Sequence, residues 1–133
     1  MFQVSFVGPM LGQAHHFRGY APEQIPYAVD RYTNEAARLY GVMDSRLSEV
    51  EYFVDDEYSV ADMAIYPWVA SHKKQGQRIE DFPNLGRWYE AMGKRPAVRR
   101  AMEVGEELRR PIEDLDEEAR DVLFGGRRRT TGA

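Results

Sequence analysis

A nearly uncharged stretch at residues 59–71 is the clearest feature of the hydrophobic pattern, since Asp62 is its only charged residue. Ser59 is a favoured N-cap residue, and Asp62 three positions later gives the spacing of a capping box, in which each side chain bonds the backbone N–H of the other residue. A helix that is apolar on every side is a buried one. The pattern therefore predicts a buried central helix, capped by Ser59 and Asp62 and kinked or widened at Pro67.

The residues before this stretch predict two more helices. Apolar side chains recur with a period near 3.6 along residues 25–49, which indicates a long amphipathic helix that begins near Pro26. Residues 1–17 are largely apolar, and they predict a helix that either begins at Pro9 or bends there.

Shorter helices are expected to begin at Pro83 and Pro96, and a last one follows the capping-box spacing of Asp114 and Glu117. No pair of strands is evident. The predicted fold is therefore all-α, a bundle of five to six helices around the central one. We expect a helical domain at residues 1–110, followed by a short helix and a flexible basic tail at residues 111–133.

The composition restricts the classes of function. At 133 residues the chain has the size of one domain, and its net charge of −4 argues against a general nucleic-acid binder. It has no cysteine, which excludes disulfides, cysteine-based zinc sites and a cysteine nucleophile. The apolar stretch is far shorter than the ~20 residues that span a membrane, and no secretory signal is present. We expect a cytoplasmic protein whose partners include neither nucleic acid nor membrane.

Candidate catalytic and metal-binding residues have simpler structural explanations. His15 and His16 are adjacent, so on a helix they point about 100° apart and do not share a metal ion. His72 has no partner at ligand spacing, and Ser71 beside it has no third member for a hydrolase triad. Asp62 is explained as a structural cap. We predict no metal site and no catalytic residue among these side chains.

Several motifs occur in a recognisable order along the chain. Ser59 and Asp62 precede the apolar helix, FPNLGRW stands at residues 82–88, and RPAV follows at residues 95–98. Together they resemble the C-terminal helical domain of a cytosolic glutathione S-transferase. GPMLGQAHHF at residues 8–17 and IPYAVDRY at residues 25–32 resemble the bacterial nu class in particular, which is of the disulfide-reductase type.

The resemblance implies that the chain helps to bind glutathione as a cosubstrate, without a metal. In the nu class an arginine of the second of these segments contacts glutathione, and here that residue is Arg31. A guanidinium can hold a glutathione carboxylate through two parallel hydrogen bonds. The alternative for Arg31 is a solvated helix charge that pairs with Glu35 four residues on. The resemblance also implies that Met10, Gln13 and Phe17 border the acceptor pocket, and packing is the alternative for all three.

Enzymes of this kind begin with a thioredoxin-like domain that holds most of the glutathione contacts, and the 133 residues contain no such domain. The resemblance therefore implies the helical part of a glutathione transferase or glutathione-dependent disulfide reductase, inactive alone and active once a thioredoxin-like domain is supplied. The alternative is a non-catalytic protein-interaction module of the same fold. The apolar first residues predict association, either as a homo-oligomer or with a thioredoxin-like domain.

Overall fold

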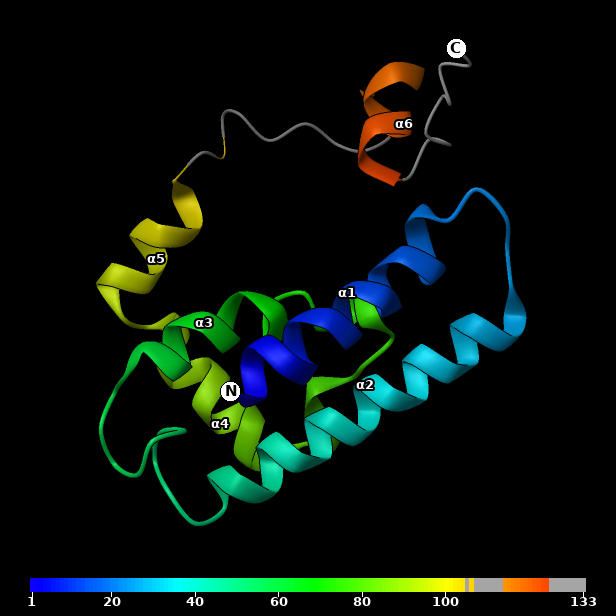
Figure 1. The fold of residues 1–133 in the computed structure, drawn as a ribbon. Coiled ribbons are helices and arrows are strands. Elements are labelled where there is room, and N and C mark those ends of the chain that lie inside the picture. Colours follow the sequence, from blue (N-terminus) through cyan, green and yellow to red (C-terminus); the bar gives the residue numbers. More distant parts are fainter. Residues whose placement is uncertain (105, 107–113, 125–133) are drawn as a thin grey trace.

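The computed structural model describes residues 1–104, 106 and 114–124, which are mainly helical (Figure 1). The predicted all-α class is confirmed, because these residues form no strand beyond an isolated bridge between Val54 and Glu57. The predicted boundary at residue 110 and the basic tail lie outside the described residues. The elements in chain order are η1 (Gln3–Val7), α1 (Gly8–His15), η2 (His16–Tyr20), α2 (Pro26–Leu47), α3 (Val60–Val69), η3 (His72–Gln75), η4 (Ile79–Asp81), α4 (Pro83–Gly93), α5 (Pro96–Glu103) and α6 (Glu117–Phe124).

One helical run leads from Gln3 to Tyr20, and the α-helical turns of α1 lie between the wider π-helical turns η1 and η2. The Gly8 N–H donates to the Gln3 carbonyl, five residues back instead of four. Proline has no N–H, and its ring collides with the carbonyl four residues earlier. A widened turn just before Pro9 relieves both problems, so the helix continues through this proline and does not begin there.

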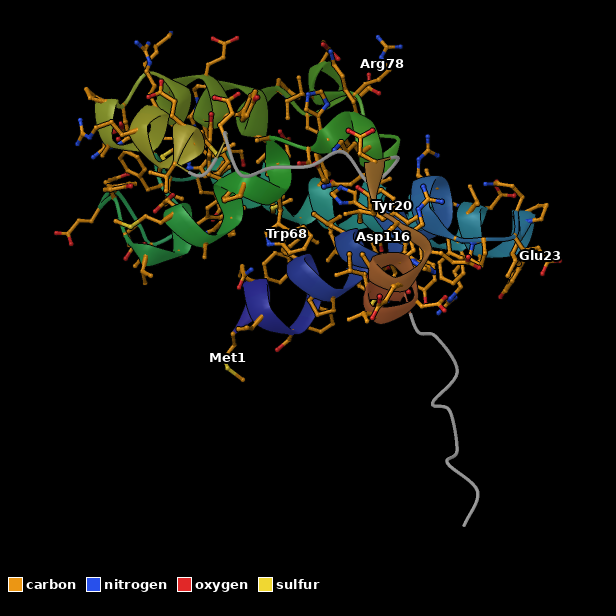
Figure 2. The ribbon with its side chains drawn as sticks, turned by 90° about the horizontal axis from the view of Figure 1, so that it is seen from above. Met1, Tyr20, Glu23, Trp68, Arg78 and Asp116 are labelled. Atoms are coloured by element: carbon orange, nitrogen blue, oxygen red, sulfur yellow. The ribbon has the colours of Figure 1, made fainter. Side chains whose placement is uncertain are left out.

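Helices α1, α2 and α3 pack around the hydrophobic core. Trp68 of α3 lies across Gly8 and Gly12 of α1 (Figure 2). A Cβ atom on Gly8 would lie 3.5 Å from this ring, which is an ordinary van der Waals contact. The buried side of α2 is the predicted apolar stripe, which comprises Ala36, Leu39, Tyr40, Met43 and Leu47.

The burial of α3 on every side is a prediction that the structure corrects. Ile65 and Val69 are buried, but Val60 is 76% exposed, Met63 is 51% exposed, and Pro67 is exposed as well. The reason is the position of α3, which packs against α1 and η1 on one side and α4 on another, while open apolar cavities separate its remaining side from α2 and α5. The central helix therefore presents an apolar strip to solvent.

The ends of α2 and α4 cap each other. The carboxylate of Asp44 on α2 accepts hydrogen bonds from the N–H groups of Asn84 and Leu85 at 2.8 and 2.9 Å, so it serves as the N-cap that Phe82 does not provide for α4. In return, Arg87 of α4 donates to the Leu47 carbonyl at 2.6 Å, at the end of α2.

None of the described helices combines the length and apolar character that crossing a bilayer requires.

Candidate functional site

Arg31 lies in the first half of α2, and its side chain is exposed. Glu35, the partner that helix spacing offers, is held instead by Arg38, whose Nε and Nη2 donate to the two carboxylate oxygens at 2.9 and 2.7 Å. This hydrogen bond from Arg38 is the main cause that lowers the pKa of Glu35, and Arg31 adds only a weaker electrostatic attraction. Among the described residues Arg31 makes no ion pair, so its five N–H donors are available to a ligand.

Phe17 lies beside the turn of α2 that carries Arg31. Its ring stacks on Tyr32, with the ring centroids 5.3 Å apart and the planes 3° from parallel. Met10, Gln13 and Phe17 are three and four residues apart, so they share one side of the first helix. Met10 is partly buried against the core, whereas Gln13 is exposed. The structure thus places Phe17 against Tyr32, the residue after Arg31, and it leaves Met10 and Gln13 further along the same helix.

Asp62 belongs to a separate cluster at the start of α3, whereas Arg31 lies in the first half of α2. Its carboxylate is fully buried. One oxygen accepts from the Trp88 indole N–H at 2.9 Å and the Phe53 N–H at 3.2 Å, and the other accepts from the Ser59 N–H at 3.0 Å and the Ser59 hydroxyl at 3.2 Å. Ser59 Oγ in turn accepts from the Ala61 N–H at 3.2 Å, which completes a capping box. A carboxylate with four donors in place acts as a joint between segments.

The segment after α3 contains a polar cluster that includes two buried glutamines. Gln75 is fully buried; its amide accepts from the Tyr40 hydroxyl at 2.7 Å and donates to the Trp68 carbonyl at 2.7 Å. Burial raises the pKa of Tyr40, so the hydroxyl stays protonated and donates. Gln77, 7% exposed, donates to the Thr33 carbonyl at 3.0 Å. In the sequence, the only indication of this buried cluster is the pair of glutamines, Gln75 and Gln77, on either side of Gly76.

His15 is half-buried beside Trp68, with ring centroids 6.1 Å apart. Its Nε2 is buried and has no hydrogen-bond partner within the described part of the chain. Burial is the main cause that lowers the pKa of His15, the charge of Lys74 lowers it further, and a hydrogen bond with the Ser71 backbone opposes both. Residues 1–104, 106 and 114–124 contain no group of three His, Asp or Glu side chains placed to hold a metal ion.

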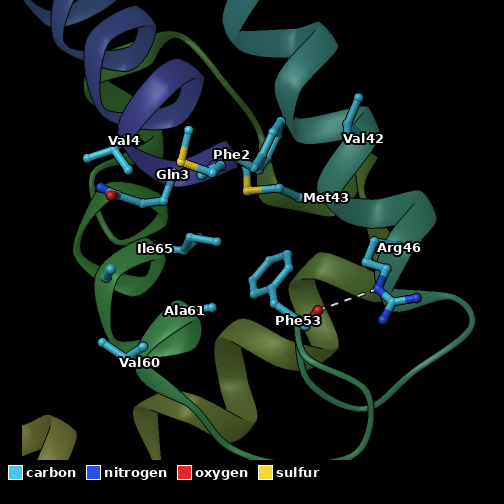
Figure 3. A pocket seen from close by; sticks show the side chains of 12 residues that line it. Phe2, Gln3, Val4, Val42, Met43, Arg46, Phe53, Val60, Ala61 and Ile65 are labelled. Carbon is cyan, nitrogen blue, oxygen red and sulfur yellow. Dashed lines mark hydrogen bonds between the residues drawn. The ribbon is translucent and has the colours of Figure 1, made fainter.

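A large apolar groove opens between η1, the end of α2 and the start of α3 (Figure 3). Its volume is about 520 Å³. A second apolar cavity of about 240 Å³ lies between α3, α4 and α5. Neither is lined by Arg31, Met10, Gln13 or Phe17. The main apolar side chains of the groove are Phe2, Val4, Val42, Phe53, Val60 and Ile65.

Comparison with known proteins assigns this architecture to a family. Residues 8–96 match the model for the glutathione S-transferase C-terminal domain. Over 101 residues the chain is 42% identical to the disulfide-bond oxidoreductase YfcG of Escherichia coli, covering 76% of this chain and 47% of that one. The disulfide-bond oxidoreductase YghU of the same species is 39% identical over 108 residues, covering 75% and 38%. The chain therefore spans half or less of the length of these two relatives.

Solved structures with the same fold contain glutathione. A glutathione transferase URE2P6 from Phanerochaete chrysosporium, in complex with oxidised glutathione, matches with a TM-score of 0.74 and 38% identity, covering 81% of this chain and 51% of that one. A glutathione transferase from Burkholderia graminis, with two glutathione molecules bound per subunit, matches with a TM-score of 0.71 and 36% identity, covering 80% and 47%.

Proposed function

Because the chain belongs to the family of glutathione S-transferase C-terminal domains, we propose that it forms the helical wall of a glutathione and electrophile site in an enzyme of the disulfide-reductase type. The similar E. coli proteins are named disulfide-bond oxidoreductases, and similar solved structures hold glutathione. The chain spans about half of such proteins, so the reacting groups come from a thioredoxin-like domain, whether that domain lies in the same polypeptide or in a partner. A cytoplasmic location is part of the same proposal.

Arg31 is the observation that carries the proposal. Arg38 occupies both carboxylate oxygens of Glu35, and the Arg31 side chain is exposed, so its guanidinium is accessible to a ligand. A planar guanidinium suits a carboxylate, and glutathione carries carboxylates at both ends. Phe17, stacked beside this turn, borders the acceptor side of the site, with Gln13 and Met10 further along the same helix. The chain supplies binding contacts, and no catalytic residue is assigned to it.

Titration of the ¹⁵N-labelled chain with oxidised glutathione tests the proposal. One bidentate pair is worth about 1.5–3 kcal/mol, so we expect weak binding, with a Kd of about 10–100 mM and shifts centred on Arg31 and Phe17. Arg31→Ala should weaken this binding about tenfold or more. Arg100→Ala is the matched control, because it removes an exposed arginine from α5, and α5 lies on the opposite side of the fold from the start of α2 (Figure 1). Equal affinities of the two variants would overturn the proposal.

A non-catalytic interaction module remains the second candidate, and the exposed apolar groove favours it. The groove suits a thioredoxin-like domain or a second copy of the chain, since exposed apolar patches mark interfaces. A fusion with a thioredoxin-like domain ahead of Met1 separates the two functions. Turnover of a glutathione-linked disulfide by the fusion supports the enzyme, and a folded fusion without turnover supports the module.

A further inference from the structure

Three segments that are distant in the sequence meet beside the turn of α2 that carries Arg31. Arg18 of η2 donates through Nη1 to the Thr33 hydroxyl of α2 at 3.2 Å. The same guanidinium lies over Gly76, the residue that ends η3. Phe17 stacks on Tyr32, so two successive residues of η2 contact the two residues that follow Arg31.

Gly76 is suited to this place for two separate reasons. Its φ of +73° lies in the left-handed region, which a residue with a Cβ atom rarely adopts. A Cβ atom there would also lie 2.7 Å from Cζ and from Nη1 of Arg18, closer than real contacts allow. Substitution of Gly76 by any other residue therefore moves the Arg18 guanidinium away from its position over residue 76.

The η3 segment offers a firm base for this contact. Gln75 and Gln77 are buried, and they tie the segment to the Tyr40 hydroxyl and to the Thr33 carbonyl, both on α2. Thr33 thus receives one hydrogen bond from Gln77, just after η3, through its carbonyl and one from η2 through its hydroxyl. Thr33 is therefore held from two sides, and the hydrogen bond that Arg18 donates to it has a fixed acceptor.

We propose that Arg18, seated on Gly76 and bonded to Thr33, is a positioning residue that holds Phe17 and the Arg31 turn in the arrangement that receives glutathione. This Arg18–Gly76 clamp rests on the proposed function, because it acts through Arg31. Arg18 itself does not touch the ligand. The clamp fixes η2 against α2, and glutathione then meets Phe17 and Arg31 already in place, which lowers the entropy lost on binding.

The test uses the 133-residue chain with oxidised glutathione as the probe. Arg18→Ala and Gly76→Ala should each weaken binding about 2- to 10-fold, the range of one hydrogen bond, and should abolish the ring-proton NOEs between Phe17 and Tyr32. Gly19→Ala is the matched control, since a Cβ atom on Gly19 meets nothing within 4 Å. It should leave binding and the NOEs unchanged.

A double variant distinguishes the clamp from simple backbone strain at Gly76. In the Arg18→Ala background the guanidinium is gone, so Gly76→Ala should weaken binding no further, although it still lowers the melting temperature. Additive losses of affinity would overturn the proposal. Should Gly76→Ala fail to fold, Thr33→Val tests the same contact from α2, with the same expected loss of binding and of the NOEs.

The two proposals fail in different ways. If Arg31→Ala loses binding while Arg18→Ala binds normally with the Phe17–Tyr32 NOEs intact, the clamp is overturned and the proposed function stands. If Arg31→Ala binds like the unmodified chain, the proposed function is overturned, and the clamp falls with it as a device for glutathione. The NOEs need no ligand, so their persistence in Arg18→Ala overturns the clamp in either case.

Discussion

Asp62 provides the sharpest test of how the bundle is held together, because its carboxylate joins the start of α3 to α4 and to the preceding segment. Asp62→Ala removes the acceptor of three N–H groups, those of Trp88, Phe53 and Ser59. Trp88 is 1% exposed, so its indole N–H loses its partner at a place that bulk solvent does not reach. Phe53 and Ser59 are half-buried, and water reaches them more readily.

The expected loss follows from these three donors. A buried donor without a partner costs about 1–3 kcal/mol, and one that water partly satisfies costs about 0.5–1.5 kcal/mol. One donor of the first kind and two of the second give roughly 2–6 kcal/mol, so we expect a loss of about 4 kcal/mol. A small domain has a total stability of about 5–15 kcal/mol, so Asp62→Ala removes a large share of it.

Urea unfolding, followed by circular dichroism and tryptophan fluorescence, measures this loss. Asp30→Asn is the control for charge, since it neutralises an exposed carboxylate of α2 and should change stability by less than about 0.5 kcal/mol. Ser59→Ala removes only the cap hydroxyl and should cost about 1 kcal/mol. If Asp62→Ala fails to fold, Asp62→Asn is measured in its place. It keeps one acceptor oxygen, so its loss of stability should lie between those of Ser59→Ala and Asp62→Ala. A loss below about 1 kcal/mol for Asp62→Ala would show that the hydrogen bonds of Asp62 do not hold α3, α4 and the preceding segment together.

Two further predictions concern pH and association. Burial lowers the pKa of His15, so below about pH 6.5 the unfolded chain binds more protons than the folded one, and stability falls as the pH falls. His15→Gln should therefore lose less stability than the unmodified chain between about pH 7.5 and pH 5.5. Val60→Glu places a charge in the apolar groove but suits the first turn of α3, so it should weaken self-association and dye binding about tenfold at unchanged melting temperature.

Each of these predictions has a clear contrary result. Parallel pH profiles for the two chains would show that protonation of His15 is not linked to folding. An unchanged sedimentation profile of Val60→Glu at high concentration, with unchanged dye fluorescence, would show that the groove does not drive association. Asp121→Glu, an exposed acidic substitution on α6 that keeps the charge, controls for handling of the variants.

The sequence predicts the fold well where the signal is local. Ser59 and Asp62 are three residues apart, so their capping geometry depends on little beyond the chain between them. The buried stripe of α2 follows in the same way from periodicity. By contrast, the apolar composition of α3 shows which side chains avoid water, and it does not show which of them a neighbour covers. Val60 and Met63 are exposed for that reason.

The site was less predictable because its contacts join distant positions. Glu35 has an arginine both four residues before it and three residues after it, and only the side-chain geometry shows that Arg38 is the partner. The contact of Arg18 with Gly76 joins residues 58 positions apart, and neither propensity nor periodicity encodes it. Gln77 reaches Thr33 across a similar separation. The local hydrophobic pattern predicts where helices form, but only the tertiary structure shows which turns of different helices contact each other.

The geometry of α2 allows one partner domain to serve both the groove and Arg31. Val42, which lines the groove, stands eleven residues after Arg31, and eleven residues make about three turns plus 20°, so both face the same side of α2. At ~1.5 Å per residue they are roughly 17 Å apart along the helix. A domain of ~100 residues has a radius of gyration near 13 Å, so its width exceeds that span. On the proposed function, a thioredoxin-like domain seated in the groove would be wide enough to place glutathione against Arg31, and the apolar contact and the ligand contact would then form one continuous face.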